Sequence, residues 1–215
     1  MNITLIAPPA AGKGTQAKKI SKEYGIPHIS TGDLLRKIND ENLHQSLKKG
    51  QFASDELVTN LLKERLKQTD CQNGFVLDGY PRNLKQAKMY NQILAELNIP
   101  LGYIIVLDLD KEIAKKRIIG RKVCPNCGAV FNDLLEDSKP KQKDVCDNCQ
   151  NTLVKREDDN ENTFETRFQI YMKQTEPIIN YYEQNHQVYH VNSGINSDYT
   201  FNEIKKIIGG LYDQH

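Results

Sequence analysis

Four of the five cysteines in this chain have the spacing of metal ligands. Cys124 and Cys127 form one C-x2-C pair, and Cys146 and Cys149 form a second pair after a further eighteen residues. Four thiolates at this spacing suit a tetrahedral Zn²⁺ ion, and sulfur ligands also accept iron or cobalt. Because no open coordination position is implied, we expect the metal to stabilise a module that is too small to build its own apolar core.

The loop after the first apolar segment is a candidate phosphate site. Residues 3–6 predict a short buried strand, and a helix is expected to begin at Lys13 after a glycine-containing turn. The start of such a helix points several backbone N–H groups at an anion, and the helix dipole strengthens the attraction. Lys13 would reach terminal phosphates, and Thr15 would meet Mg²⁺ directly or through water. The strict phosphate-loop pattern has a glycine in place of Ala7, so an ordinary strand-to-helix turn remains an alternative at this point.

Apolar segments alternate with amphipathic segments along most of the chain. Strands are expected at residues 3–6, 28–29, 75–77, 103–107 and 188–191. Helices are expected at residues 13–24, 32–38, 54–67, 84–97, 111–119, 160–182 and 201–211. Apolar strands separated by helices predict an α/β fold with a parallel sheet that is covered on both faces. Residues 121–156 interrupt the alternation as an inserted module, and the polar segment 30–53 is a second departure.

Helical periodicity also predicts which side chains face the core. The expected inward residues are Leu57, Leu61, Leu62 and Leu66, then Leu84, Ala87, Leu94 and Leu97, and finally the stripe Phe164, Phe168 and Tyr171. Pro177 is expected to kink or divide the long helix that carries this last stripe. Arg117 and Arg121 are four residues apart, which predicts two cations on one helical face. Such a pair repels unless an anion lies between the two side chains.

Charge and cysteine usage limit the classes of protein. The 215 residues include 29 Lys and Arg against 28 Asp and Glu, for a formal net charge of +1. A binder of nucleic acid or of anionic membranes normally carries a larger basic excess. No apolar run suits a signal peptide or a membrane span, and metal-like cysteines in such a chain suit a reducing compartment. We expect a cytoplasmic protein that binds neither nucleic acid nor membranes, with Cys71 as a lone thiol.

Five motifs in order resemble those of the adenylate kinases. They are residues 12–17, 30–36, 77–82, 117–121 and 156–159, with Arg167 downstream. The resemblance covers essentially the whole chain and is closest to the bacterial long-lid type with a zinc-binding lid. It implies the P-loop nucleoside monophosphate kinase fold, a parallel five-stranded sheet flanked by helices. The implied parts are a core of residues 1–29, 54–120 and 160–215, an AMP-binding insert of residues 30–53, and a zinc-binding lid of residues 121–159.

The same resemblance implies the activity and its cofactors. The expected reaction is reversible phosphoryl transfer from MgATP to AMP, which gives two ADP, in a cytoplasmic monomer. Mg²⁺ would be held through water by Asp78, and a structural Zn²⁺ by Cys124, Cys127, Cys146 and Cys149. The catalytic residues implied are Lys13, Arg82, Arg121, Arg156 and Arg167. Guanidinium groups suit this role because they bind phosphate oxygens bidentately and stay charged when they are desolvated.

The resemblance also assigns the two nucleotide subsites. The ATP-binding residues implied are Ala10, Ala11, Gly12, Lys13, Gly14, Thr15, Arg117, Arg121, Val130, Phe131 and Asn196. The AMP-binding residues implied are Thr31, Arg36, Gln51, Phe52, Ala53, Gly79, Tyr80, Pro81, Arg82, Gln86, Arg156 and Arg167. Gln86 should face the acceptor base, although an amide that can flip does not by itself select adenine. Asp158 and Asp159 follow the lid, at positions that the family uses at the hinge and near the nucleotide.

Two alanines in the phosphate loop keep alternative functions open. Ala7 and Ala10 replace glycines of the family pattern, and an alanine held at positive φ costs on the order of 1 kcal/mol. We therefore expect an active enzyme with weakened phosphate binding. The alternatives are a kinase for GMP, UMP or CMP, and a nucleotide-binding regulator with weakened catalysis. A zinc-ribbon nucleic-acid binder is a third alternative, which the near-zero net charge disfavours.

Overall fold

A five-stranded parallel sheet organises the computed structural model, which describes residues 1–41, 45, 53–156 and 159–210. The strand order is β2-β3-β1-β4-β7, and every neighbouring pair is parallel. The strands are β1 (Asn2–Ile6), β2 (His28–Ser30), β3 (Phe75–Asp78), β4 (Tyr103–Asp108) and β7 (Val188–Asn192). The predicted fold class is confirmed, because strands that are buried on both faces need apolar residues at consecutive positions.

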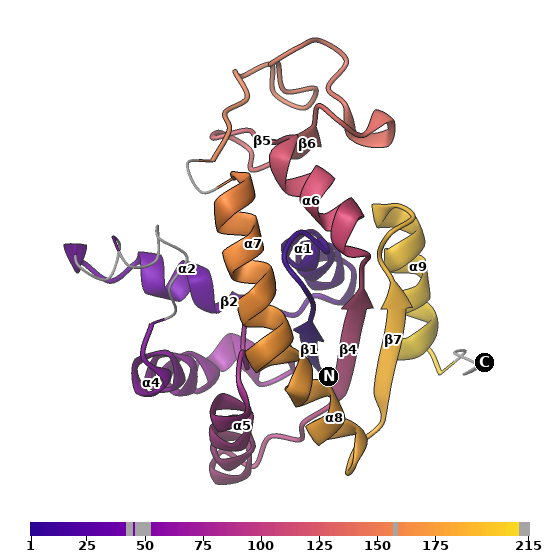
Figure 1. The fold of residues 1–215 in the computed structure, drawn as a ribbon. Coiled ribbons are helices and arrows are strands. Elements are labelled where there is room, and N and C mark those ends of the chain that lie inside the picture. Colours follow the sequence, from indigo (N-terminus) through magenta and orange to yellow (C-terminus); the bar gives the residue numbers. More distant parts are fainter. Residues whose placement is uncertain (42–44, 46–52, 157–158, 211–215) are drawn as a thin grey trace.

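Helices cover both faces of this sheet (Figure 1). They are α1 (Lys13–Tyr24), α2 (Thr31–Arg36), α4 (Asp55–Leu66), α5 (Leu84–Glu96), α6 (Lys111–Ile119), α7 (Glu161–Ile170), α8 (Glu176–Glu183) and α9 (Ser197–Ile208). Short 3-10 turns lie at Thr69–Cys71 and Glu136–Ser138. In the described part of the chain, no helix has the length and apolar character needed to span a membrane.

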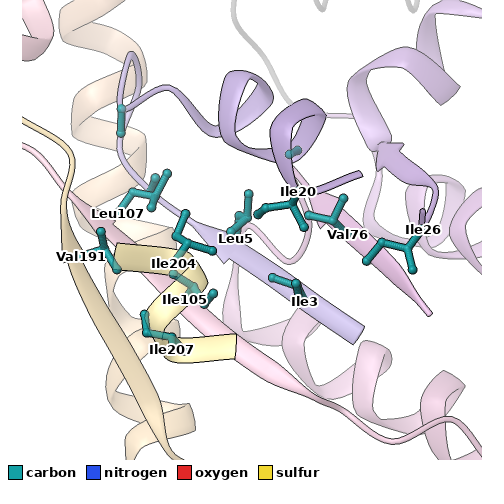
Figure 2. Packing of buried hydrophobic residues seen from close by; sticks show 13 residues of the cluster. Ile3, Leu5, Ile20, Ile26, Val76, Ile105, Leu107, Val191, Ile204 and Ile207 are labelled. Atoms are coloured by element: carbon teal, nitrogen blue, oxygen red, sulfur yellow. The ribbon is translucent and has the colours of Figure 1, made fainter. Parts of the chain in front are cut away.

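The main core lies between the sheet and the pair α1 and α9. Figure 2 shows Ile3 and Leu5 of β1 pointing toward Ile20 of α1, with Ile204 and Ile207 of α9 closing the cluster. Each of these five side chains is at most 2% exposed. Successive strand residues point to opposite faces, so alternate residues of β4 pack against α1 and α9 or against α5 and α8. The loops at the strand ends are thereby held in fixed positions.

Side-chain caps explain where most of the helices begin. The Ser54 hydroxyl accepts from the backbone N–H of Leu57, and the Asn83 carbonyl oxygen accepts from that of Gln86. Asn196 caps α9 in the same way, so this helix begins four residues before the predicted start at residue 201. These caps satisfy N–H groups that have no partner inside the helix. Helix α1 differs, because its N-cap residue is Gly12, which has no side chain to accept a hydrogen bond.

The inward faces of two helices differ from the prediction. Leu84, the first residue of α5, is 39% exposed. The buried face of α5 includes Tyr90 and Ile93 instead, beside the predicted Ala87 and Leu94. In α4 the buried residues are Val58, Thr59, Leu62 and Leu66, whereas Leu57 and Leu61 are only partly buried. Because the prediction followed the leucines, it placed the buried face of each helix at a different angle from the one observed.

The long predicted helix at residues 160–182 is divided. Residues Tyr171–Thr175 form a π-helical turn between α7 and α8, and Pro177 lies in the first turn of α8. Proline has no N–H to donate to the preceding turn, so a local change of helical hydrogen bonding is expected just before it. The aromatic stripe is confirmed, because the ring centroid of Phe168 lies 5.6 Å from that of Phe164 and 6.3 Å from that of Tyr171.

The inserted module contains a hairpin that the sequence did not predict. Strands β5 (Arg121–Val123) and β6 (Val130–Asn132) pair antiparallel and form a second sheet above the main one (Figure 1). Isolated bridges join Val123 to Val154 and Val145 to Thr152. Strands of three residues are too short to give a recognisable alternation of apolar and polar residues.

Candidate active site

A large cavity lies at the carboxyl ends of β1, β2 and β3, between the sheet and the β5–β6 hairpin. Its volume is about 1880 Å³, whereas pockets for one drug-sized ligand reach about 1000 Å³. Ligands of open α/β sheets bind at this edge of the sheet. The cavity therefore has room for two ligands of nucleotide size.

Nearly all of the described residues that the sequence assigned to nucleotide binding line this cavity. They are Ala10, Ala11, Gly12, Lys13, Gly14, Thr15, Thr31, Arg36, Ala53, Asp78, Gly79, Pro81, Arg82, Gln86, Arg117, Arg121, Val130, Phe131, Arg156, Arg167 and Asn196. Tyr80 is not among them, because its ring is 1% exposed and packs in the core. Gln51, Phe52 and Asp158 lie outside the described residues.

The loop between β1 and α1 has the properties of an anion site. Gly12, the N-cap residue of α1, has a φ of 82°, and the first N–H groups of the helix have no side-chain cap. The Lys13 ammonium donates to the carbonyl of Ala7 at 3.0 Å. Burial lowers the pKa of Lys13, although the nearby Asp78 carboxylate opposes this shift. A phosphate bound at this helix N-terminus would relieve the cost of burying the Lys13 charge.

Asp78 ends strand β3 next to this loop. Its Oδ2 atom lies 3.5 Å from His28 Nε2 and 3.5 Å from the point where a Cβ on Gly14 would lie. Burial alone would raise the pKa of Asp78, but the nearby His28 ring and the charges of Lys13 and Arg82 outweigh it, so the pKa is lowered. Asp78 therefore offers the cavity an ionised carboxylate, the type of oxygen ligand that suits Mg²⁺.

The turn after β3 holds Arg82 against the cavity. Gly79 has a φ of 85°, and a Cβ there would lie 2.9 Å from the Thr31 hydroxyl and 3.1 Å from Arg82 Nη2, so only glycine fits. The Gly79 carbonyl accepts from Thr31 Oγ1 at 2.9 Å and from Arg82 Nε at 2.7 Å. Burial lowers the pKa of Arg82, Asp78 opposes the shift, and the charges of Arg167 and Arg36 add to it.

Arg117 and Arg121 both line the cavity, but they do not share a helical face. Helix α6 ends at Ile119, so Arg121 lies in strand β5, and the predicted i, i+4 relation was wrong. Arg117 Nη2 donates to the carbonyl oxygens of Ser193 at 2.8 Å and Gly194 at 3.3 Å. Arg121 forms a bidentate ion pair with the buried Asp159, in which Nε lies 2.7 Å from Oδ2.

The sequence did not single out two residues that contact this machinery. His28 lies in β2 beside Asp78, and the Thr175 hydroxyl donates to the carbonyl of Arg82 at 2.8 Å. Thr175 is 7% exposed and belongs to the π-helical turn. Neither residue has a local pattern that could have revealed it, although His28 lies only two residues before the predicted Ser30 motif. Their roles arise from strands and helices that meet in the fold.

The four cysteines of the module form one cluster. Their Sγ atoms lie within 4.8 Å of one another, with 3.4 Å between Cys124 and Cys149 and 3.5 Å between Cys127 and Cys146. A tetrahedral Zn²⁺ with Zn–S distances of about 2.3 Å separates its sulfurs by about 3.8 Å. The cluster therefore fits a metal ion of this size and geometry.

The two cysteine pairs share one backbone conformation. The N–H of Gly128 donates to the carbonyl of Cys124 at 3.0 Å, and that of Gln150 to the carbonyl of Cys146 at 2.9 Å. Both donors have positive φ, 69° and 59°. Hydrogen bonds from the Asn126 side chain and the Asn151 backbone lower the pKa of Cys149. Such bonds stabilise a thiolate, which is the form that binds a metal.

The two loop alanines differ in conformation. Ala10 has a φ of 65°, whereas Ala7 lies outside the positive-φ region and is 6% exposed. The expected backbone strain is therefore confined to Ala10. Ala7 stands where the family pattern has glycine, and its methyl group packs in the main core cluster.

Single substitutions to glycine should separate these two environments. Ala10→Gly relieves an αL conformation and should raise the free energy of unfolding by up to about 1 kcal/mol, reduced by the greater entropy of the unfolded chain. Ala7→Gly removes a buried methyl and should lower it by about 1 kcal/mol. Urea unfolding of both variants tests this contrast, and equal effects at the two positions would contradict it.

Comparison with known proteins identifies the family. The family model for adenylate kinase matches residues 5–187. The adenylate kinase of Geobacillus sp. (strain WCH70) is 42% identical, over 98% of this chain and 100% of the relative. The adenylate kinase of Clostridium kluyveri (strain ATCC 8527) is 41% identical, over 98% and 99%, and that of Thermosipho africanus (strain TCF52B) is 39% identical, over 97% and 99%. With this extent of similarity, and with the cavity that its motifs line, the chain belongs to the adenylate kinase family.

Proposed function

We propose that the cavity carries out the reaction of this family, the reversible transfer of the terminal phosphoryl group of MgATP to AMP, which gives two ADP. The observation that carries the proposal is one cavity of about 1880 Å³ that gathers the phosphate loop and the side chains of Arg82, Arg121, Arg156 and Arg167. Similarity to adenylate kinases over nearly the whole chain disfavours both the regulator and the kinases for other acceptors.

The ATP side of the cavity is assigned to the phosphate loop and the segments that face it. The uncapped N-terminus of α1 and the Lys13 ammonium would bind the phosphates of ATP. Arg117 holds the Ser193–Gly194 carbonyls, next to Asn196, where the adenine of ATP would lie. Val130 and Phe131 of the hairpin would cover this nucleotide from above. All of these groups line the same cavity.

The AMP side is assigned to α2 and the turn after β3. Arg36 lies at the end of α2, where Asp33 accepts a hydrogen bond from it, and Arg82 lines the same cavity near enough to feel its charge. Both guanidinium groups would grip the phosphate of AMP, and Gln86 would face its base, with Thr31 and Ala53 alongside. Gln51 and Phe52 belong to the same proposal but lie outside the described residues.

Positioning and charge neutralisation account for the chemistry. An oxygen of the AMP phosphate attacks the terminal phosphorus of ATP, and ADP leaves with the electron pair of the broken bond. The cationic side chains lower the barrier by neutralising charge on the oxygens that surround the transferred phosphorus. Bound Mg²⁺ would supply further neutralisation, and the ionised Asp78 is suited to hold it through water. The hairpin over the cavity would keep water away from the reacting phosphorus.

We also propose the division of the chain and the role of its metal. The core comprises residues 1–29, 54–120 and 160–215, the AMP-binding insert residues 30–53, and the lid residues 121–159. A structural Zn²⁺ held by the four cysteines would replace an apolar core in the lid. The enzyme would act as a monomer, because one chain supplies both nucleotide subsites, and in the cytoplasm, where thiolate ligands stay reduced.

The zinc assignment predicts a loss of stability without a loss of chemistry. Cys146 is fully buried in the cluster, so Cys146→Ser should release the metal and lower the melting temperature by several degrees. Turnover at low temperature should persist, because no cysteine touches the reacting phosphates in this proposal. Cys71→Ser is the control and should keep the metal. Full metal content in Cys146→Ser, measured by elemental analysis, would refute the assignment.

The subsite assignment predicts different kinetic effects for two cations. Arg36→Ala should raise the KM for AMP roughly tenfold and leave the KM for ATP unchanged, since it removes charge-assisted hydrogen bonds to one substrate. Lys13→Ala should lower kcat by about two to three orders of magnitude, because its contact strengthens in the transition state. Lys37→Ala, a neighbouring exposed cation, is the control. A changed ATP KM with an unchanged AMP KM in Arg36→Ala would reverse the subsites.

One assay tests the function as a whole. ADP formation is measured from ATP with AMP, GMP, UMP or CMP as the acceptor. The proposal expects by far the highest kcat/KM with AMP. A higher kcat/KM with another monophosphate would show that this monophosphate, and not AMP, is the acceptor. If no ADP formed with any of them, the chain would instead be the nucleotide-binding regulator.

A further inference from the structure

The side-chain amide of Gln86 is held in one orientation by two partners, one of which donates a hydrogen bond while the other accepts one. Gln86 is 2% exposed and lines the cavity on its AMP side. Its Oε1 atom accepts from the backbone N–H of Arg82 at 2.8 Å, and its Nε2 atom donates to Asp55 Oδ1 at 2.8 Å. The two ends of the amide are therefore distinguished by their surroundings.

A flip of this amide is disfavoured at both ends. The Arg82 backbone N–H can only donate, and both oxygens of the Asp55 carboxylate can only accept. A flipped amide would turn its N–H groups toward the Arg82 N–H and its oxygen toward the carboxylate. Two buried hydrogen bonds would be lost, and two repulsive contacts would replace them. Sequence alone leaves this orientation open, because Asp55 and Gln86 are 31 residues apart.

Asp55 is itself fixed by its neighbours. Its Oδ1 atom also accepts from Asn83 Nδ2 at 2.8 Å, and Lys85 Nζ lies 3.7 Å from Oδ2. The Asn83 amide cannot turn freely, because its own oxygen accepts from the Gln86 backbone N–H at 2.8 Å and caps α5. Asp55 lies in the first turn of α4, where the helix dipole favours a negative charge. The acceptor that Gln86 meets is thus a fixed part of the scaffold.

The fixed amide presents a defined pattern to a nucleobase. Within the described residues, Oε1 and Nε2 each use one of their two hydrogen-bonding positions, which leaves one acceptor and one donor in a set order. At position 6 adenine carries an amino group that donates, whereas guanine and hypoxanthine carry an oxygen that accepts. Oε1 can accept from the 6-amino group, but it repels a 6-oxo group in the same place. A 6-oxo group in the place of the 6-amino group would need a donor there, which a flip of the amide would supply.

We propose that Asp55 is a specificity-determining positioning residue, which locks the Gln86 amide so that the acceptor site takes 6-aminopurine monophosphates and rejects 6-oxopurine monophosphates. Asp55 does not line the cavity and acts through Gln86. The inference rests on the proposed function, in which the base of AMP lies against Gln86. The inference explains why the Gln86 amide selects 6-aminopurines, although an amide that is free to flip could bind either class of purine.

The test is the ratio of kcat/KM for AMP to that for inosine monophosphate, which differs from AMP only in carrying the 6-oxo base. Asp55→Ala removes the penalty at one end of a flipped amide, and the ratio should fall about tenfold. Asp55→Asn should keep most of the ratio, because the asparagine oxygen can accept both hydrogen bonds. Glu56→Ala removes the adjacent, exposed carboxylate, which does not touch Gln86, and should leave the ratio unchanged.

The outcomes separate this inference from the function on which it rests. Equal losses with both acceptors in Asp55→Ala would leave the ratio intact and overturn the inference, since Asp55 would then be only structural. Gln86→Leu should abolish most of the discrimination, and an unchanged ratio there would instead refute the placement of the base. If Asp55→Ala fails to fold, Asp55→Ser carries the same expectation, because a hydroxyl both donates and accepts.

Discussion

The burial of several cations around one cavity is the constraint on which the rest of this structure depends. Burial lowers the pKa of Lys13, Arg82 and Arg117, which means that the fold holds these charges where water solvates them poorly. Asp78 offsets part of this cost for Lys13 and Arg82, and its own pKa is lowered in return. A bound polyphosphate would offset the remainder, so the cavity favours anionic ligands.

The scaffold orients Arg82 and Arg117 in part through backbone groups. Arg82 is fixed through its backbone, whose N–H donates to Gln86 and whose carbonyl accepts from Thr175. Arg117 donates to two backbone carbonyls, which are neutral. Arg121 and Arg36 each pair with a carboxylate as well, the buried Asp159 and Asp33. Guanidinium groups that are oriented before substrate arrives lose little entropy on binding, which favours catalysis by positioning.

Sequence predicted the parts of this protein that local pattern encodes. Apolar strands between amphipathic helices gave the parallel sheet, and the motifs named residues that the fold gathers into one cavity. Features set by distant contacts escaped prediction. Leu84 is apolar yet exposed, Arg121 leaves the helix of Arg117, and the β5–β6 hairpin is too short to show a period. The orientation of Gln86 depends on Asp55, a partner that only the packing of α4 against α5 brings near.

The melting temperature of Lys13→Met, with and without inorganic tripolyphosphate, tests the electrostatic account most directly. Methionine keeps the length of the side chain and removes the buried charge. Without the anion the variant should melt above the wild type, because a buried cation whose burial cost Asp78 offsets only in part has been replaced by an apolar group. Tripolyphosphate should then stabilise the wild type much more than the variant. A variant that melts below the wild type without the anion, and gains as much from it, would contradict the account.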